Sequence, residues 1–317
     1  MKKTEIANDL YTLAQLTKRD LKLFLKDKLN VFFSLLAPLI VFALYILFLG
    51  DTQLQAVNAS IPEGVIIDQR LIRAFIDSWM LSGVLGVGCL TVSLQANCIM
   101  VQDKSKGILN DGISSPVKKS VIKLSYYVFN FVITFTIMFV IFLVCLIYLA
   151  AKNSWFMSAG DVFSLFGTLL LAIFSATLIT VLIADLFKTE AALGAFSGIT
   201  SAIIGFLLGA YIPMSIMPVG LQYVSALLPA SHSVGMFKQF FVSGVLDEMS
   251  KTAPLQFIEG LKENYSVDLN FFGKYIQADI MSVYIACSII LFAAILLILN
   301  RKKTLTSNFV SKNKKKL

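Results

Sequence analysis

The stretch LSYYVFNFVITFTIMFVIFLVCLIYLAA, residues 124–151, decides the fold of this chain. It contains no Asp, Glu, Lys or Arg and exceeds the ~20 residues that cross a bilayer core as an α-helix. Five more uncharged apolar windows lie at residues 31–49, 80–101, 162–184, 193–212 and 280–299. The sequence therefore predicts an all-α membrane protein with six transmembrane helices.

The distribution of Lys and Arg predicts which side of the membrane each segment faces. Six crossings leave both termini on one side, and the termini and connections of that side hold 20 of the 27 Lys and Arg residues. The positive-inside rule therefore predicts cytoplasmic termini in a multi-pass protein of the cell (plasma) membrane. The basic cytoplasmic tail, residues 300–317, ends in a Lys-rich cluster at 312–316, which favours attraction to anionic membrane lipid over nucleic-acid binding.

Residues 1–30 are mostly polar, and we expect them to remain in the mature protein because a secretory signal has a short charged leader. Apolar residues recur there at helical spacing, which predicts a cytoplasmic amphipathic helix along the inner leaflet. The remaining residues, 31–317, form one six-helix transmembrane domain. The apolar stripe of the first segment consists of Ile6, Leu10, Leu13, Thr17, Leu21 and Phe24.

The cytoplasmic connection at residues 102–123 has the sequence QDKSKGILNDGISSPVKKSVIK. Gly107, Gly112 and Pro116 disfavour one continuous helix through it. We expect a short helix, a turn near Ser115 and Pro116 and a helical restart. Together these pieces would form a compact knob at the membrane face.

Prolines divide the apolar sequence after the fifth window. Pro213, Pro218 and Pro229 leave pieces of about ten residues, too short to cross a membrane. They predict an outer re-entrant helical segment between helices 5 and 6, followed by an external cap of helices, within residues 213–279. For the first outer connection, residues 51–78, the sequence predicts no particular fold.

Small residues occupy one row of the fifth window. Such a row lets helix backbones approach closely, which fits packing within the chain and a subunit interface equally well. The row consists of Gly194, Gly198, Ala202, Gly205 and Gly209.

The sequence lacks the patterns that an enzyme or an ATPase needs. The single histidine, His232, has no HExxH context, so a structural role is the simplest interpretation. The four cysteines lie in apolar windows and form no CxxC pair, so neither a zinc site nor a disulfide is predicted. No GxxxxGK[ST] loop is present. We therefore predict a non-catalytic chain that binds no metal and no cofactor, and whose energy comes from a partner.

The residues after the second window resemble those of a known family. Asp103, Gly107-Ile108-Leu109 and Ser115-Pro116-Val117 are similar to the acidic residue, the Gly-Thr-Leu run and the Thr-Pro-Val turn of type-2 ATP-binding-cassette (ABC) transporter permeases. Lys18-Arg19-Asp20, followed by Ala37-Pro38, resembles the interfacial helix and first span of that family. The prolines at 213, 218 and 229 resemble its re-entrant segment.

The resemblance implies the membrane subunit of an ABC exporter, in a bacterial cell membrane. Its partners would be a second permease subunit, in a homodimer or heterodimer, and ABC ATPase subunits that bind ATP and Mg. The implied ATPase-coupling residues are Asp103, Lys104, Gly107, Leu109, Ser115, Pro116 and Lys118, and the interfacial helix contributes Lys18, Arg19, Asp20 and Phe24.

The same resemblance places a substrate path or dimer interface between the second and fifth crossings. An uncharged path fits an amphipathic or lipophilic substrate, such as a drug, a peptide antibiotic or a lipid-linked molecule, and hence multidrug resistance. Ser and Thr, however, often bond to their own helix. The alternatives are an ion-coupled secondary transporter or channel, a membrane enzyme and a structural anchor. The candidate residues are Gln95, Asn97, Gly198, Thr200, Ser201 and Gly205 for the path, and Pro213, Pro218, Pro229 and His232 for the re-entrant segment.

Overall fold

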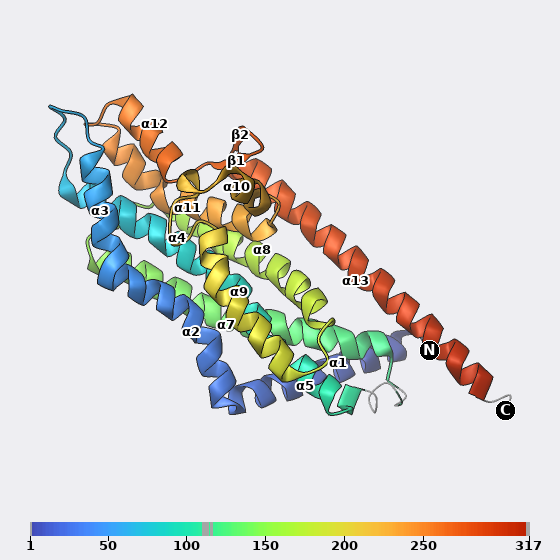
Figure 1. The fold of residues 1–317 in the computed structure, drawn as a ribbon. Helices are drawn as coiled ribbons and strands as arrows, with labels where there is room; N and C mark the ends of the chain where they lie inside the picture. The colour runs from blue at the N-terminus through green and yellow to red at the C-terminus, as the bar shows by residue number, and fades with distance from the viewer. Residues whose placement is uncertain (1, 110–113, 115–116, 315–317) are drawn as a thin grey trace.

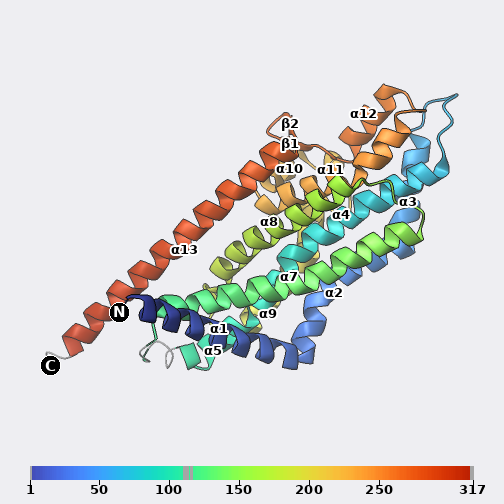
Figure 2. The same cartoon turned by 180° about the vertical axis from the view of Figure 1, so that it is seen from behind.

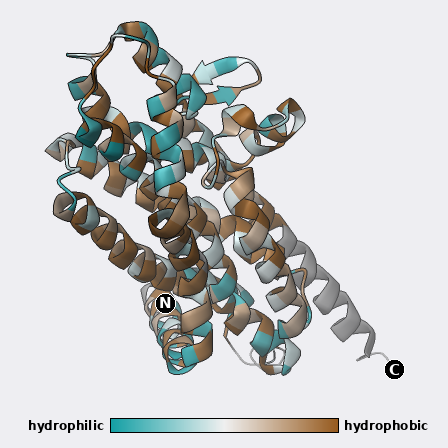
Figure 3. Ribbon diagram, turned by 60° about the vertical axis from the view of Figure 1, so that its left-hand side comes forward, coloured by the Kyte–Doolittle hydropathy of each residue, from teal (hydrophilic) through white to brown (hydrophobic). Residues whose placement is uncertain are grey.

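Long helices form a bundle in the computed structural model of this chain, which describes residues 2–109, 114 and 117–314 (Figure 1). Within those residues, six helices are long and apolar enough to span a membrane. Figure 3 shows hydrophobic residues concentrated along the long helices and hydrophilic residues gathered toward the two ends of the bundle. The predicted all-α membrane protein with six transmembrane helices is confirmed.

The chain runs back and forth between two ends of the bundle (Figures 1 and 2). The elements before the re-entrant segment are α1 (Lys2–Lys26), α2 (Lys28–Leu44), a π-helix (Tyr45–Leu49), α3 (Gly50–Ala59), α4 (Gln69–Ala96), α5 (Cys98–Ser105), α7 (Lys119–Ala151), α8 (Ala159–Ala184) and α9 (Glu190–Leu207). The later ones are a 3₁₀ turn (Met214–Ile216), α10 (Val219–Ala226), α11 (Pro229–Met249), α12 (Leu255–Asn264), β1 (Leu269–Phe271), β2 (Lys274–Ile276) and α13 (Ala278–Lys314). One end of the bundle, which we call the α1 end, carries α1, α5 and the start of α7, and the opposite end carries α3, α12 and the hairpin of β1 and β2 (Figures 1 and 2).

The first crossing extends beyond its apolar window. Helix α2 continues through the π-helix into α3 without a loop, and α4 begins at Gln69. The connection expected at residues 51–78 is therefore much shorter, because only residues 60–68 lie between the two helices. Helix α3 is amphipathic: Gln53 and Val57 are buried, whereas its other face is exposed. A hydropathy window averages the apolar and the polar face of such a helix, and the low mean hydropathy then predicts a polar loop.

Helix α4 is the centre of the bundle, since 89% of its most apolar window is buried. It packs against α2, α7, α8 and α11. Three glycines permit these close contacts. A Cβ at Gly83 would lie 2.7 Å from Ala210, one at Gly86 2.1 Å from Val234, and one at Gly88 2.7 Å from Met138.

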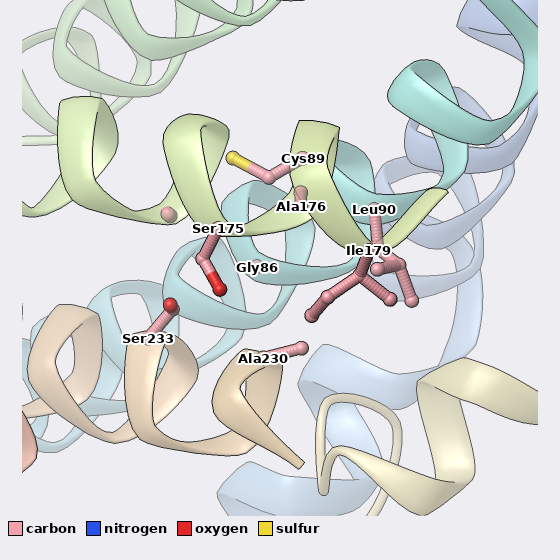
Figure 4. A pocket seen from close by; sticks show the side chains of 9 residues that line it. Gly86, Cys89, Leu90, Ser175, Ala176, Ile179, Ala230 and Ser233 are labelled. Atoms are coloured by element: carbon pink, nitrogen blue, oxygen red, sulfur yellow. The ribbon is translucent and has the colours of Figure 1, made fainter. Parts of the chain in front are cut away.

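Small side chains also fill the crossing of α4, α8 and α11. Figure 4 shows Gly86 beside Ser175, Ala176, Ala230 and Ser233. The cavity that remains there measures about 10 Å³. It is large enough for about one water-sized sphere, so this part of the core is closed to substrates.

The re-entrant segment begins near the middle of the bundle and returns to the opposite end. Ala230 and Ser233, near the start of α11, face the middle of α4 at Gly86. The far end of α11, from Val242 to Met249, packs with the start of α4 around Phe75. One prediction about this segment is wrong: α11 has 21 residues rather than about ten. No proline follows Pro229 until Pro254, so nothing in the sequence ends the helix earlier.

The region after α11 is not purely helical. Helix α12 matches the expected cap, but strands β1 and β2 then pair antiparallel, with Leu269 opposite Ile276. Phe272 and Gly273 form the two-residue turn with φ of 51° and 89°. Positive φ at both turn positions is the geometry that joins two twisted strands tightly. The prediction of a cap made only of helices is therefore wrong for residues 269–276.

Candidate functional site

Helix α1 lies against α7 at the α1 end of the bundle (Figure 2). Its predicted apolar stripe divides between two environments. Ile6 and Leu10 are 58% and 60% exposed, whereas Thr17 and Phe24 are buried. Phe24 packs edge-to-face on Phe129 of α7, with ring centroids 5.8 Å apart. The second half of α1 is therefore anchored to protein, and the first half presents its apolar side outward.

Four side chains join α1 to α5 and α7, and we call them the Arg19 cluster: Arg19, Asp20, Asp103 and Tyr126. Arg19 donates to both carboxylate oxygens of Asp103, from Nη1 at 2.6 Å and from Nη2 at 2.9 Å. The Tyr126 hydroxyl donates to Asp103 Oδ2 at 2.7 Å, and Arg19 Nη1 also donates to Asp20 at 2.8 Å. Bidentate charged hydrogen bonds of this kind fix both distance and orientation.

The Arg19 cluster sets one cation against two carboxyl groups that are each 1% exposed. Hydrogen bonds from Arg19 to Asp103 raise the pKa of the guanidinium, which stays charged. Burial raises the pKa of Asp20 to about 7, although the charge of Arg19 opposes this shift. Proton binding by Asp20 near neutral pH would leave one positive and one negative charge in the cluster.

Further polar contacts join α5 and the residue before α7 to α1, α8 and α9. Lys118 Nζ donates to Asp9 Oδ2 on α1 at 2.6 Å. Lys104 Nζ donates to the backbone carbonyl of Asp185, after α8, at 2.6 Å. Gln102 Nε2 donates to Glu190 Oε2, at the start of α9, at 3.3 Å. The α1 end thus links α1, α5, α7, α8 and α9 through polar groups.

The predicted break after α5 lies at Gly107, where φ is +77°. Glycine adopts this left-handed conformation without the steric cost that a Cβ imposes. Leu109 then packs against the apolar cluster around Phe24. Lys18 is exposed on α1. Ser115 and Pro116, and with them the predicted turn, lie outside the described residues.

A groove of about 800 Å³ runs between α2 and α9. Three of the residues predicted for a path or interface line it: Gln95, Gly198 and Ser201. The sequence did not single out Ser197, whose buried hydroxyl has no hydrogen-bond partner and which also lines the groove. The apolar walls come mainly from Phe33, Leu36, Ile40, Leu44, Phe48, Phe206 and Tyr211.

The other three candidates for the path do not line this groove. Asn97 is buried and donates from Nδ2 to the backbone carbonyl of Ser93 at 2.9 Å. Thr200 is half-buried on α9. Gly205 is covered by Tyr211, since a Cβ there would lie 2.1 Å from its ring. Asn97 and Gly205 therefore contact other parts of the chain rather than the groove.

A buried polar network in the middle of the bundle was not predicted. Ser93 Oγ donates to Asn130 Oδ1 at 2.8 Å and lies 2.7 Å from Thr180 Oγ1. Asn130 Nδ2 donates back to the Ser93 carbonyl at 2.8 Å. The network satisfies buried polar groups of α4, α7 and α8 and so fixes how these helices are rotated. An Asn inside an apolar window was the only signal for it.

The candidate residues of the re-entrant segment lie at helix starts. Pro213 and Pro218 precede the 3₁₀ turn and α10, and Pro229 is the first residue of α11. His232 is buried, stacks on Tyr284 with centroids 3.8 Å apart, and places Nε2 2.8 Å from the Ala226 carbonyl. Within the described residues, no three His, Cys, Asp or Glu side chains gather as a metal site requires.

Comparison with known proteins agrees with this architecture. The sequence model of a family described as ABC-2 family transporter protein matches residues 74–300, which is more than half of the chain. No curated protein and no solved structure gives a significant match. The match covers α4 to α13, including the re-entrant segment and five of the six spanning helices. The chain therefore belongs to the ABC-2 family of transporter proteins and is a multi-pass membrane permease.

Proposed function

We propose that this permease is the membrane subunit of an ABC exporter and that a separate ATPase drives it from the α1 end. The observation that carries the proposal is the Arg19 cluster, in which Arg19 of α1 and Tyr126 of α7 both bind Asp103. Asp103 belongs to the segment that resembles the ATPase-contacting part of type-2 permeases. A force applied to this segment would reach three helices at once.

The α1 end has the features that an ATPase would need to move the helices. Its buried charged hydrogen bonds hold α1, α5 and α7 as one body, which suits rigid-body motion between two states. Gly107 separates this body from the segment that follows it. We infer that the α1 end faces the cytoplasm, because the segments of that side carry 20 of the 27 Lys and Arg residues. ATP and Mg would bind to the partner ATPase.

We further propose that α2 and α9 face a second permease subunit. Only 22% of the most apolar window of α9 is buried within the chain. Within the described residues, a Cβ at Gly194 or at Gly198 would meet no atom within 4 Å, so there is open space beside this part of the small-residue row. An open row of small residues lets another helix approach closely, which favours the subunit interface over packing within the chain.

The substrate path would then run along the groove between α2 and α9. Its walls are apolar, and Gln95, Ser197 and Ser201 supply amide and hydroxyl groups without a formal charge. Such a lining suits an amphipathic or lipophilic molecule that needs few directed polar contacts. A drug, a peptide antibiotic or a lipid-linked molecule fits this description.

Co-purification tests the proposal. The full-length chain, tagged and extracted in mild detergent, should retain an ATPase that carries a GxxxxGK[ST] loop. Replacing Gly107 by Pro should reduce ATP-driven export while the amount of chain in the membrane stays normal. Wild-type export by that variant at normal expression would contradict the role given to this segment.

A further inference from the structure

Lys238 is a buried lysine of α11 that the proposed mechanism does not use. The residue is 2% exposed, and α11 is not among the six helices that could span a membrane. Its Nζ donates to the backbone carbonyl of Tyr265, directly after α12, at 3.5 Å, which is long for a hydrogen bond. It also lies 5.1 Å from the centre of the Trp79 ring on α4. The amine therefore lies where α4, α11 and the end of α12 meet.

Among the described residues, no carboxylate forms an ion pair with Lys238. The acidic groups on the elements around α11 are Asp77 on α4, Asp161 on α8, Glu259 and Glu263 on α12, Asp268 before β1 and Asp279 on α13. The other titratable groups on these elements include Arg73 on α4, Lys262 on α12, Tyr284 on α13, and His232, Asp247 and Glu248 on α11 itself. Asp77 and Asp268 accept hydrogen bonds from Ser154 and Gln239, at 2.9 and 2.6 Å. A positive charge on Lys238 would therefore be stabilised only by a long hydrogen bond and an aromatic ring.

Tyr265 is the residue that fastens the end of α12 to the bundle. Its ring packs edge-to-face on Phe75 and on Trp79, with centroids 5.3 Å apart in both pairs. Its hydroxyl donates to Gln53 Oε1 on α3 at 2.9 Å, and Trp79 Nε1 donates to its backbone carbonyl at 2.8 Å. Lys238 donates to the same carbonyl. The buried amine is therefore part of the contact that holds α12 in place.

The protonation of Lys238 and the docking of α12 oppose each other. Burial lowers the pKa of Lys238 to about 7, from its ordinary value of 10.5, because it disfavours the charged form. When Tyr265 moves away from Trp79 together with α12, water reaches the amine and the pKa returns toward the ordinary value. The docked state therefore binds this proton less tightly than the undocked state. By linkage, docking strengthens as pH rises from about 7 to about 10, and it stays at its weakest level below about 7.

We propose that Lys238 is a pH-sensitive restraint on α12: a proton on its buried amine weakens the docking of α12 on α4 and α11, and loss of that proton strengthens it. Helix α12 would be loosened near neutral pH and fastened in alkaline medium. The far half of α11 packs in the same apolar cluster as α12, so the same proton would also affect how firmly the re-entrant segment is held. The inference requires neither the transported substrate nor the ATPase.

Hydrogen–deuterium exchange of the full-length purified chain in detergent tests the inference. The readout is the protection of backbone amides in peptides from residues 255–265, corrected for the intrinsic pH dependence of exchange. We expect protection to rise about 50-fold from about pH 7 to about pH 9, and to change less than about threefold between about pH 6 and 7. Peptides from residues 125–149 of α7 report global unfolding and should change less than about threefold over the whole range.

Two variants assign the effect to one lysine. Lys238→Met keeps a side chain of similar length without the amine, so protection of residues 255–265 should be high and independent of pH. Lys262→Met removes a half-buried lysine of α12 itself and should keep the wild-type pH dependence. The proposal is overturned if wild-type protection is equal at pH 7 and 9, if α7 changes as much as α12, if the pH dependence survives in Lys238→Met, or if it disappears in Lys262→Met. The wild-type series and Lys262→Met decide the matter even where Lys238→Met does not fold.

Discussion

Replacing Asp103 by Asn tests whether the Arg19 cluster holds α1 against α5 and α7. Asn preserves the size of the side chain but removes the charge that accepts two hydrogen bonds from Arg19. Breaking a fully buried ion pair costs about 3–5 kcal/mol. The Arg19 side chain is 36% exposed and keeps Asp20 at 2.8 Å. We therefore expect a smaller loss, about 2 kcal/mol in the free energy of unfolding.

A double-mutant cycle isolates the ion pair from other effects of the substitution. Asp103→Asn, Arg19→Gln and the double variant are unfolded in mixed micelles, and we expect a coupling energy of about 1–2 kcal/mol. The control cycle uses Asp9→Asn and Lys118→Gln. That pair also links α1 to the start of α7, at 2.6 Å, but its side chains are 33% and 51% exposed. Its coupling energy should stay below about 1 kcal/mol.

The same variants should differ in transport. A change of about 2 kcal/mol alters the equilibrium between docked and undocked α1 about 30-fold. In the assembled complex, Asp103→Asn should therefore lower substrate moved per ATP hydrolysed by several-fold, whereas Asp9→Asn should leave it near wild type. Additive effects in the first cycle, together with unchanged transport, would refute the role of the Arg19 cluster.

Three further predictions follow from individual positions. Gly198→Phe should disrupt subunit pairing, measured by light scattering, with little change in the melting temperature. Gly167→Phe on α8 is the control, because an added Cβ at either glycine would meet no atom within 4 Å. Equal loss of pairing in both variants would contradict the α9 interface. Gly107→Ala should destabilise the chain by about 1–2 kcal/mol because φ is +77°, which unfolding measurements can check against Gly260→Ala, whose φ is not positive. Burial raises the pKa of Asp20 to about 7, so the folded state binds a proton more tightly than the unfolded state, and stability from this group is present below pH ~4 and lost as pH rises to about 7. Asp20→Asn should flatten that part of the stability profile, and a profile identical to that of wild type would argue against proton binding at Asp20.

The six crossings could be predicted because their windows are long and uncharged, as residues 124–151 illustrate. The ends of the helices could not, because α3 gains its stability by packing one face on α4 rather than from its average hydropathy. The hairpin was missed for a related reason. Its turn places Phe272 at a positive φ, a conformation that bulky residues rarely adopt, so the sequence gives no turn signal at that position.

The candidate site was predictable only in part. Arg19, Asp20 and Asp103 were identified through a family resemblance. The contact between Arg19 and Asp103 could not be predicted, because the two residues lie 84 positions apart in the sequence. Tyr126 joins them only because α7 packs beside α1, which no local pattern reveals. In the path, Ser201 and Thr200 are neighbours in sequence, yet only Ser201 lines the groove. The rotation of α9 about its axis decides which of them is available.

The central claim is that this permease moves substrate only when ATP hydrolysis by a separate ATPase drives it. The most direct measurement is substrate accumulation in sealed vesicles that contain the purified chain, with and without its ATPase. We predict accumulation that requires the ATPase and ATP, and none with the chain alone. Uphill accumulation by the chain alone, driven by an ion gradient, would contradict the account and favour secondary transport.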